Sequence, residues 1–154
     1  MKIALALSGG GARCAAQLGY IEAIGQLVEI EAFAGSSGGA IAAALLAKGY
    51  APKEALEIVE SLDYSKIKLK LRGAIFDSRP MQSELQKIGL DNFQTLQKPL
   101  FVTLTDYQSL QTRYVNSGDL PSALLASAAL LPLLHRWSSK IAPISTEVLA
   151  TTSP

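Results

Sequence analysis

GSSGG, residues 35–39, has the form G-x-S-x-G, with Ser37 at its centre. A short apolar run of strand type, AFA at residues 32–34, precedes it, and AIAAALLAK at residues 40–48 follows it. The second segment is a strong helix former, because alanine and leucine have high helix propensity. This order predicts a sharp strand-to-helix turn that pushes the Ser37 hydroxyl out of a sheet. The helix would also direct its unpaired N–H groups at the serine, where they stabilise negative charge.

The glycines on either side of Ser37 have a steric explanation. A turn this tight leaves no room for larger side chains, which accounts for Gly35, Gly38 and Gly39. A glycine-rich turn also forms wherever a strand meets a helix closely, so the motif alone leaves a purely structural role open.

A second glycine-rich segment lies near the beginning of the chain. KIALAL at residues 2–7 is a continuous apolar run, as expected of a strand that is buried on both faces. Gly9, Gly10 and Gly11 come next, and residues 14–27 then carry apolar side chains at the spacing of a helix with one buried face. Three successive glycines let backbone N–H groups converge beside a helix start, which is typical of an anion-binding site.

Nucleotide-binding loops fit this second segment less well. It lacks the Lys-Ser/Thr ending of a P-loop, and Cys14 stands where a dinucleotide-binding loop would carry its third glycine. Arg13 is either a solvated surface residue or a group that locks the loop by donating to backbone carbonyls.

Several segments together resemble the patatin-like phospholipases, which are serine lipid acyl hydrolases with a Ser–Asp dyad. The two specific motifs are SGGGAR at residues 8–13 and GSSGG at residues 35–39. TLTD at residues 103–106 is similar to the family's T-x-x-T-D strand end, and ASAALLP at residues 126–132 is similar to its A-S-x-A-x-P helix end. The resemblance covers residues 1–134.

The resemblance implies a fold and a set of site residues. The fold is a three-layer α/β/α sandwich with a mainly parallel central sheet, here C-terminally incomplete. The alternation of strand and helix patterns along the chain favours the same α/β class. Ser37 is the implied nucleophile, and the backbone of Gly9, Gly10 and Gly11, together with Arg13, is the implied oxyanion region.

The spacing of apolar residues and the positions of proline and glycine predict the remaining helices and strands. They predict helices over residues 52–62, 78–88 and 121–130, and strands over residues 100–105 and 112–116. A short polar turn joins the two strands, which is compatible with an antiparallel pair.

The last part of the chain departs from the family pattern. The family's second catalytic residue is the Asp of an Asp-Gly-Gly or Asp-Gly-Ala turn, yet neither Asp nor Gly occurs after Pro132. Asp106 and Asp119 favour structural roles, as a hydrogen-bonding residue at a strand end and as a helix N-cap. We therefore expect a partial catalytic domain at residues 1–134 and an atypical tail at residues 135–154 that is out of frame or disordered.

A frameshift would account for this tail. A one-base shift over residues 134–154 permits a string containing Asp-Gly-Gly, with its Asp encoded across the Ser145 and Thr146 codons. The encoding DNA after the codon for Pro132 decides this hypothesis. Without that Asp we expect an inactive chain, because a serine hydroxyl without a base is a poor nucleophile.

Composition favours one soluble globular domain: 154 residues, of which 49% are hydrophobic and 18% are charged. The net charge of +1 provides no electrostatic basis for binding nucleic acid. Cys14 is the single cysteine, which excludes an internal disulfide, fits a small core residue and predicts a cytoplasmic location. No cluster of His, Cys and Asp indicates a metal or a cofactor. His135, the single histidine, lacks the acidic neighbour that a Ser–His–Asp triad needs.

The expected ligand is a lipid or another acyl ester. KIKLKLR at residues 66–72 favours a strand or loop edge with a solvated face over a weak contact with a lipid surface. Peripheral membrane contact and oligomerisation remain compatible with the sequence. Two other function classes stay open, namely a non-catalytic lipid-binding or scaffold protein and a glycine-loop anion-binding module.

Overall fold

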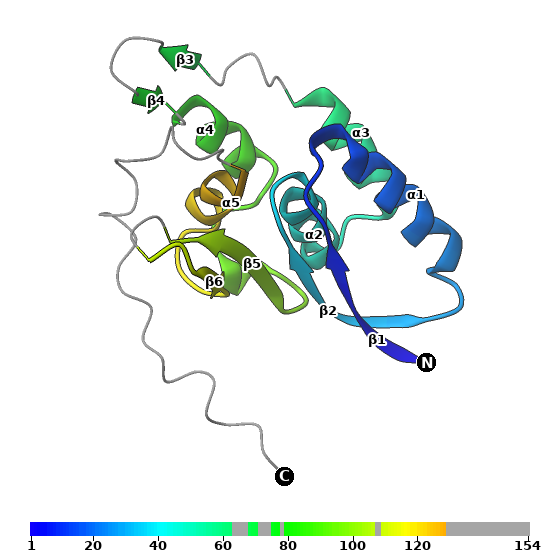
Figure 1. Ribbon diagram of the computed structural model, residues 1–154. Coiled ribbons are helices and arrows are strands. Elements are labelled where there is room, and N and C mark those ends of the chain that lie inside the picture. Colours follow the sequence, from blue (N-terminus) through cyan, green and yellow to red (C-terminus); the bar gives the residue numbers. More distant parts are fainter. Residues whose placement is uncertain (63–67, 71–74, 78, 107–108, 129–154) are drawn as a thin grey trace.

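The computed structural model describes residues 1–62, 68–70, 75–77, 79–106 and 109–128 (Figure 1). The tail expected at residues 135–154 lies outside the described residues, as does most of the basic segment at residues 66–72.

A four-stranded sheet forms the base of the molecule. Its strands are β1 (Lys2–Leu7), β2 (Glu29–Gly35), β5 (Leu100–Thr105) and β6 (Thr112–Val115), and they lie in the order β1-β2-β5-β6. β1, β2 and β5 are parallel, whereas β6 pairs with β5 in the antiparallel sense. The prediction of an α/β fold with a mainly parallel sheet is therefore confirmed.

Helices and one small hairpin make up the rest of the described chain. The helices are α1 (Cys14–Ile24), α2 (Gly38–Lys48), α3 (Pro52–Ser61), α4 (Arg79–Lys87) and α5 (Leu120–Ala128). The hairpin pairs β3 (Lys68–Lys70) with β4 (Ile75–Asp77). β3 confirms the strand interpretation for the middle of the basic segment.

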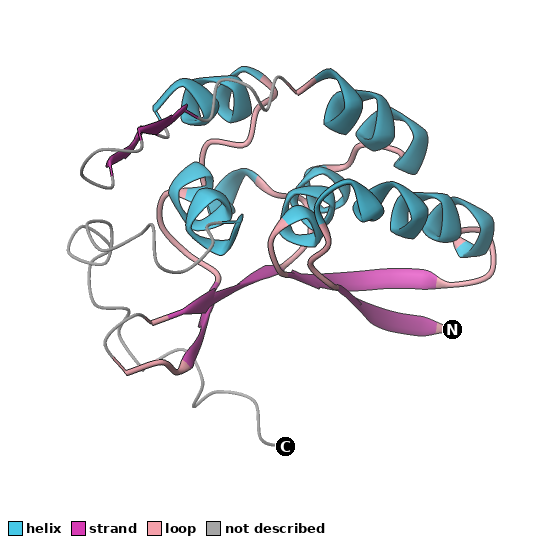
Figure 2. Ribbon diagram, turned by 45° about the horizontal axis from the view of Figure 1, so that its top comes forward, coloured by secondary structure: helices cyan, strands magenta, loops and turns pink. Residues whose placement is uncertain are grey.

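The five described α-helices lie over one face of the four-stranded sheet, as Figure 2 shows. For α1 to α4 the physical reason is the strand order, which proceeds from β1 through β2 to β5 in one direction, and α5 packs against β5 and α2 on the same face. Because crossovers between parallel strands are right-handed, helices that connect such strands fall on the same face. The described residues thus supply the sheet and one helical layer of the expected sandwich, and they do not test its other helical layer.

α2 is the central element of this layer. It contacts β1, β2 and β5 below it and α1, α3 and α5 beside it. Residues 39–47 are all buried, as expected of a helix that is apolar all round. Its alanines keep the helix thin, so neighbouring elements approach it closely. Anything held at either end of α2 is therefore held by the core of the protein.

Two elements differ from their predicted bounds by three residues, and the other predicted elements differ by no more than two. β2 begins at Glu29, three residues before the predicted residues 32–34. The prediction began late because Glu29 and Glu31 interrupt the apolar pattern that marks a buried strand. α1 ends at Ile24, before the predicted residue 27, and Leu27 is 75% exposed instead of buried. Gly25 closes the helix by donating its N–H to the Ile21 carbonyl oxygen at 2.8 Å.

Candidate active site

Ser37 occupies a strained position between β2 and α2. It is the N-cap of α2, with φ 52° and ψ −128°, and is one of two described non-glycine residues with positive φ. Such a conformation costs on the order of 1–3 kcal/mol and persists only where the surrounding structure enforces it. The Ser37 hydroxyl makes no hydrogen bond with any described residue. The sequence prediction of a sharp strand-to-helix turn at this serine is confirmed.

The glycines of the turn are required by close backbone packing. A Cβ added to Gly35 would lie 2.5 Å from the Ala40 Cα, and one added to Gly39 would lie 2.5 Å from the Leu7 carbonyl oxygen. These distances are far below van der Waals contact, and the atoms that would clash belong to rigid backbone. The prediction that this turn leaves no room for larger side chains is confirmed at Gly35 and Gly39.

The glycine loop of residues 9–11 packs directly against the turn. A Cβ on Gly9 would lie 3.2 Å from the Ser37 Cβ, and one on Gly38 would lie 2.7 Å from the Gly11 carbonyl oxygen. Gly11 has φ 56°, a left-handed conformation that glycine adopts without strain. The fold thus brings together two segments that the sequence separates by more than twenty residues.

Several backbone donors at this junction have no acceptor among the described residues. They are the N–H groups of Gly9, Gly10, Gly11, Gly38 and Gly39. The last two belong to the first turn of α2, where a helix leaves its N–H groups unpaired and carries a partial positive charge. This concentration of donors beside a serine hydroxyl is suited to holding a negatively charged oxygen.

Ser127 ties the turn to the rest of the fold. The Ser37 N–H donates to the Ser127 Oγ at 2.8 Å, and the Ser127 hydroxyl donates to the Thr103 carbonyl oxygen at 2.7 Å. One hydroxyl therefore links the serine turn, α5 and β5. The A-S-x-A-x-P resemblance picked out Ser127 in the sequence but assigned it no role. This contact spans 90 residues of chain, so no local pattern could have revealed it.

The glycine loop has its own anchor. Gln17, on α1, donates through Nε2 to the carbonyl oxygen of Ser8 at 3.0 Å and to its Oγ at 3.1 Å. The Arg13 N–H donates to the Gly10 carbonyl oxygen at 3.1 Å, which closes a short turn of 3-10 helix. The Arg13 side chain is exposed and makes no hydrogen bond or ion pair with a described residue. Of the two interpretations that the sequence left open for Arg13, the exposed side chain fits a solvated surface residue, and only the backbone N–H of Arg13 donates to a carbonyl of the loop.

The two aspartates interpreted as structural do make structural contacts. Asp119 accepts the Ser122 N–H at 2.8 Å and so caps α5, as predicted. Asp106 accepts the Ser109 N–H at 3.0 Å, and its Oδ2 lies 3.6 Å from the Arg113 Nε. Both carboxylates stabilise local backbone or pair with a neighbour. The residues in which the resemblance would place a second catalytic group lie outside the described part of the chain.

Cys14 lies next to the glycine loop but is not activated. It is 3% exposed, and burial raises the pKa of its thiol above the ordinary value of 9.0. Hydrogen bonds from the Cys14 and Ala15 backbone act in the opposite direction and are outweighed. A protonated, buried thiol is a core group, as the composition suggested.

Two features are absent from the described residues and bear on other kinds of site. These residues contain no group of three or more His, Cys, Asp or Glu residues that could hold a metal ion. No helix within the described ranges is both long enough and apolar enough to span a bilayer.

Comparison with known proteins gives a family and a solved structure of similar fold. The family model described as patatin-like phospholipase matches residues 5–146. The structure of the type III effector protein ExoU has a similar fold, with a TM-score of 0.58 and 20% sequence identity. The match covers 84% of this chain and 40% of the ExoU chain, so this chain spans less than half of that protein. The search of curated proteins gives no match.

Proposed function

Since the chain belongs to the patatin-like phospholipase family, we propose that it is built to hydrolyse lipid acyl esters, with Ser37 as the nucleophile. The observation that carries the proposal is the strained Ser37 beside a glycine loop with unpaired N–H groups. Strain of this kind clusters at functional sites, because the surrounding structure must hold a reactive group in place.

The proposed reaction begins with attack of the Ser37 Oγ on the ester carbonyl carbon. A base takes the hydroxyl proton, and the carbonyl oxygen becomes an oxyanion in the tetrahedral intermediate. The N–H groups of Gly38 and of Gly9, Gly10 and Gly11 are the proposed donors to that oxyanion. Collapse of the intermediate expels the alcohol with a proton, and water then releases the acid from the acyl-enzyme.

The Ser37 N–H is not among these proposed donors, since it is already bound to Ser127. Gly38 and Gly39 therefore present the first unpaired donors of α2. In the proposal the oxyanion accepts hydrogen bonds from the start of this helix and from the glycine loop together. Arg13, which the resemblance adds to the oxyanion region, is proposed to shape that region through its backbone N–H, which closes the turn at Gly10.

The proposed base is a carboxylate that the described residues do not provide. Asp106 and Asp119 are engaged elsewhere, and the tail at residues 135–154 contains no Asp. We retain the frameshift as the explanation, with the Asp encoded across the Ser145 and Thr146 codons. The reading frame of the encoding DNA after Pro132 tests it directly, and absence of Asp-Gly-Gly from every frame would overturn it.

Covalent labelling with a fluorophosphonate probe tests the role of Ser37. Two proteins are labelled, the 154-residue chain and a version with the alternative reading frame restored. Ser37→Ala should abolish labelling in both, whereas Ser36→Ala, a change in the same turn, should preserve it. The restored version should react about 10²–10⁴-fold faster, because it regains its general base.

The outcomes also separate the alternative functions. Equal loss of labelling in Ser36→Ala and Ser37→Ala would contradict the assignment of the nucleophile. No labelling of either protein, combined with binding to lipid vesicles, would instead support a non-catalytic lipid-binding protein. Binding of inorganic phosphate without labelling would support an anion-binding module.

A further inference from the structure

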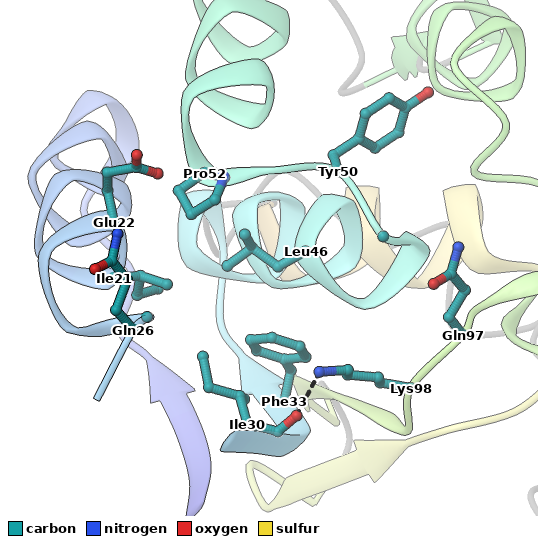
Figure 3. Close-up of a pocket in the computed structure, with 12 residues that line it drawn as sticks. Ile21, Glu22, Gln26, Ile30, Phe33, Leu46, Tyr50, Pro52, Gln97 and Lys98 are labelled. Atoms are coloured by element: carbon teal, nitrogen blue, oxygen red, sulfur yellow. Dashed lines mark hydrogen bonds between the residues drawn. The ribbon is translucent and has the colours of Figure 1, made fainter. Parts of the chain in front are cut away.

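A pocket of about 440 Å³ lies at the edge of the sheet opposite to Ser37 (Figure 3). It is bounded by the C-terminal ends of α1 and α2, the first half of β2 and the segment that leads into β5. Its volume falls within the usual range for sites that bind small molecules. The lining residues are Ile21, Glu22, Gly25, Gln26, Ile30, Phe33, Leu46, Gly49, Tyr50, Pro52, Gln97 and Lys98.

The floor of the pocket is apolar and rigid. Ile21, Phe33 and Leu46 are at most 7% exposed and belong to the hydrophobic core, so their positions are fixed by packing. Figure 3 shows Leu46 and Phe33 one above the other at the centre of the pocket, with Ile30 beside Phe33. A ligand on this floor would order no flexible segment, and the apolar surface that it covers is mainly that of the half-buried Ile30, because the floor side chains are already nearly buried.

Five carbonyls at the helix ends beside the pocket are already hydrogen-bonded. Two helix carbonyls, of Leu45 and Leu46, accept the N–H groups of Tyr50 and Gly49 at 3.1 Å each. The Ala47 carbonyl accepts two further N–H groups, from Gln97 and Lys98. At the end of α1, the Ile21 and Ile24 carbonyls accept those of Gly25 and Leu27. A cationic ligand would therefore find no free helix carbonyl among these.

The one partly buried charge in the pocket is the Lys98 ammonium. Its Nζ donates to the Ile30 carbonyl oxygen at 2.6 Å and has no carboxylate partner among the described residues. An ammonium has three donors, so two remain available to a ligand. Glu22 lies across Leu46 from Lys98 in Figure 3, on the exposed rim, and its Oε1 is 3.6 Å from the Lys53 Nζ.

We propose that this pocket binds an aliphatic monocarboxylate, the chemical class of a free fatty acid. The carboxylate meets the Lys98 ammonium, and the alkyl chain lies across Phe33 and Leu46 toward Ile21. Lys98 supplies a charge-assisted hydrogen bond, and the half-buried Ile30, beside the apolar floor, supplies the surface that the alkyl chain covers. The pocket lies away from Ser37, so this binding does not require the proposed hydrolysis and stands independently of it.

Octanoate is the probe, measured by methyl NMR of Ile- and Leu-labelled protein. The experiment uses the Ser37→Ala variant, so that turnover cannot contribute. Octanoate should shift the methyl signals of Ile21, Ile30 and Leu46. Lys98→Met, which keeps the chain length but removes the charge, should weaken binding about ten-fold or more. Lys87→Met, an exposed lysine change on α4, should leave binding unchanged.

Octylamine provides the charge-reversed comparison. The proposal expects it to bind more weakly than octanoate to the parent protein and to lose that disadvantage in Lys98→Met. Octanoate affinity that is equal in Lys98→Met and in Lys87→Met would overturn the proposal. Shifts confined to methyl groups outside the pocket would overturn it as well, because the ligand would then bind at another place.

Discussion

The two ends of α2 are built in opposite ways. At its N-terminal end the first N–H groups are unpaired, no side chain caps the helix, and Ser37 is strained. At its C-terminal end Gly49 adopts the left-handed conformation with φ 109°, and hydrogen bonds satisfy the carbonyls of Leu45, Leu46 and Ala47. The same buried helix thus leaves its donors available at one end and satisfies its acceptors at the other.

This difference indicates what each end can do. Unpaired donors beside a strained hydroxyl cost folding energy, and they are of use only to a negative charge that arrives from outside. The three bonded carbonyls at the C-terminal end are not available to a ligand, so the pocket beside them depends on a side chain, Lys98. We therefore assign the proposed chemistry to the N-terminal end of α2 and the proposed ligand binding to its C-terminal end.

The largest expected effect comes from crowding the N-terminal end. Gly39→Ala would place a methyl group 2.5 Å from the Leu7 carbonyl oxygen and still closer to that of Ser8. Both atoms are backbone at the end of β1 and cannot move aside. We expect a loss of about 3 kcal/mol or more in the free energy of unfolding, measured by urea denaturation.

Gly19→Ala is the matched control for that change. Gly19 lies within α1, and an added Cβ meets no atom within 4 Å. Alanine is the better helix former, so this variant should gain about 0.5–1 kcal/mol. If Gly39→Ala is as stable as Gly19→Ala, the packing of the serine turn against β1 is not what holds Ser37 in its conformation.

A smaller effect is expected when Ser127 is changed. Ser127→Ala removes the hydroxyl that bridges the Ser37 N–H and the Thr103 carbonyl oxygen, leaving both partly buried groups unpaired. The expected cost is about 1–3 kcal/mol in the free energy of unfolding. The fluorophosphonate labelling rate of Ser37 should fall as well, because the turn loses its link to α5 and β5.

Ser127→Thr separates positioning from packing, since it keeps a hydroxyl at the same place. It should restore most of the labelling rate. Equal labelling rates in Ser127→Ala and the parent protein, at matched fraction folded, would show that the bridge stabilises the fold without positioning the nucleophile.

Much of the fold was accessible from the sequence because its signals are local. The apolar run of β1, the helical spacing of α3 and the G-x-S-x-G turn are each readable within about ten residues. β2 was predicted too short, because Glu29 and Glu31 are exposed at the end of a strand whose other half is buried. α1 was predicted too long, because Leu27 fits the helical spacing although the chain has already turned at Gly25.

Only part of the candidate site could be predicted from the sequence, because only part of it is formed by local patterns. The two glycine-rich segments are local patterns, and their meeting follows from parallel strands ending at one edge of a sheet. The Ser127 bridge and the Lys98 pocket depend on residues 90 and 68 positions from their partners, and no periodicity encodes such contacts. Arg13 is a case in which a local motif is present but does not determine what the side chain contacts.

The smallest expected effect concerns Cys14 and tests how burial acts on a side chain next to the glycine loop. This thiol begins α1, beside the glycine loop, yet burial raises its pKa above 9.0. The folded protein therefore keeps the thiol proton at a pH where the unfolded chain has already lost it. Stability should fall as pH rises above about 9, by at most about 1.4 kcal/mol per pH unit from this group. Unfolding free energies measured from about pH 8 to about pH 10 should decline more steeply for the parent than for Cys14→Ala, in which lysine and tyrosine titration remains. Equal slopes would contradict the raised pKa, and they would mean that the backbone hydrogen bonds of Cys14 and Ala15 offset the burial of the thiol.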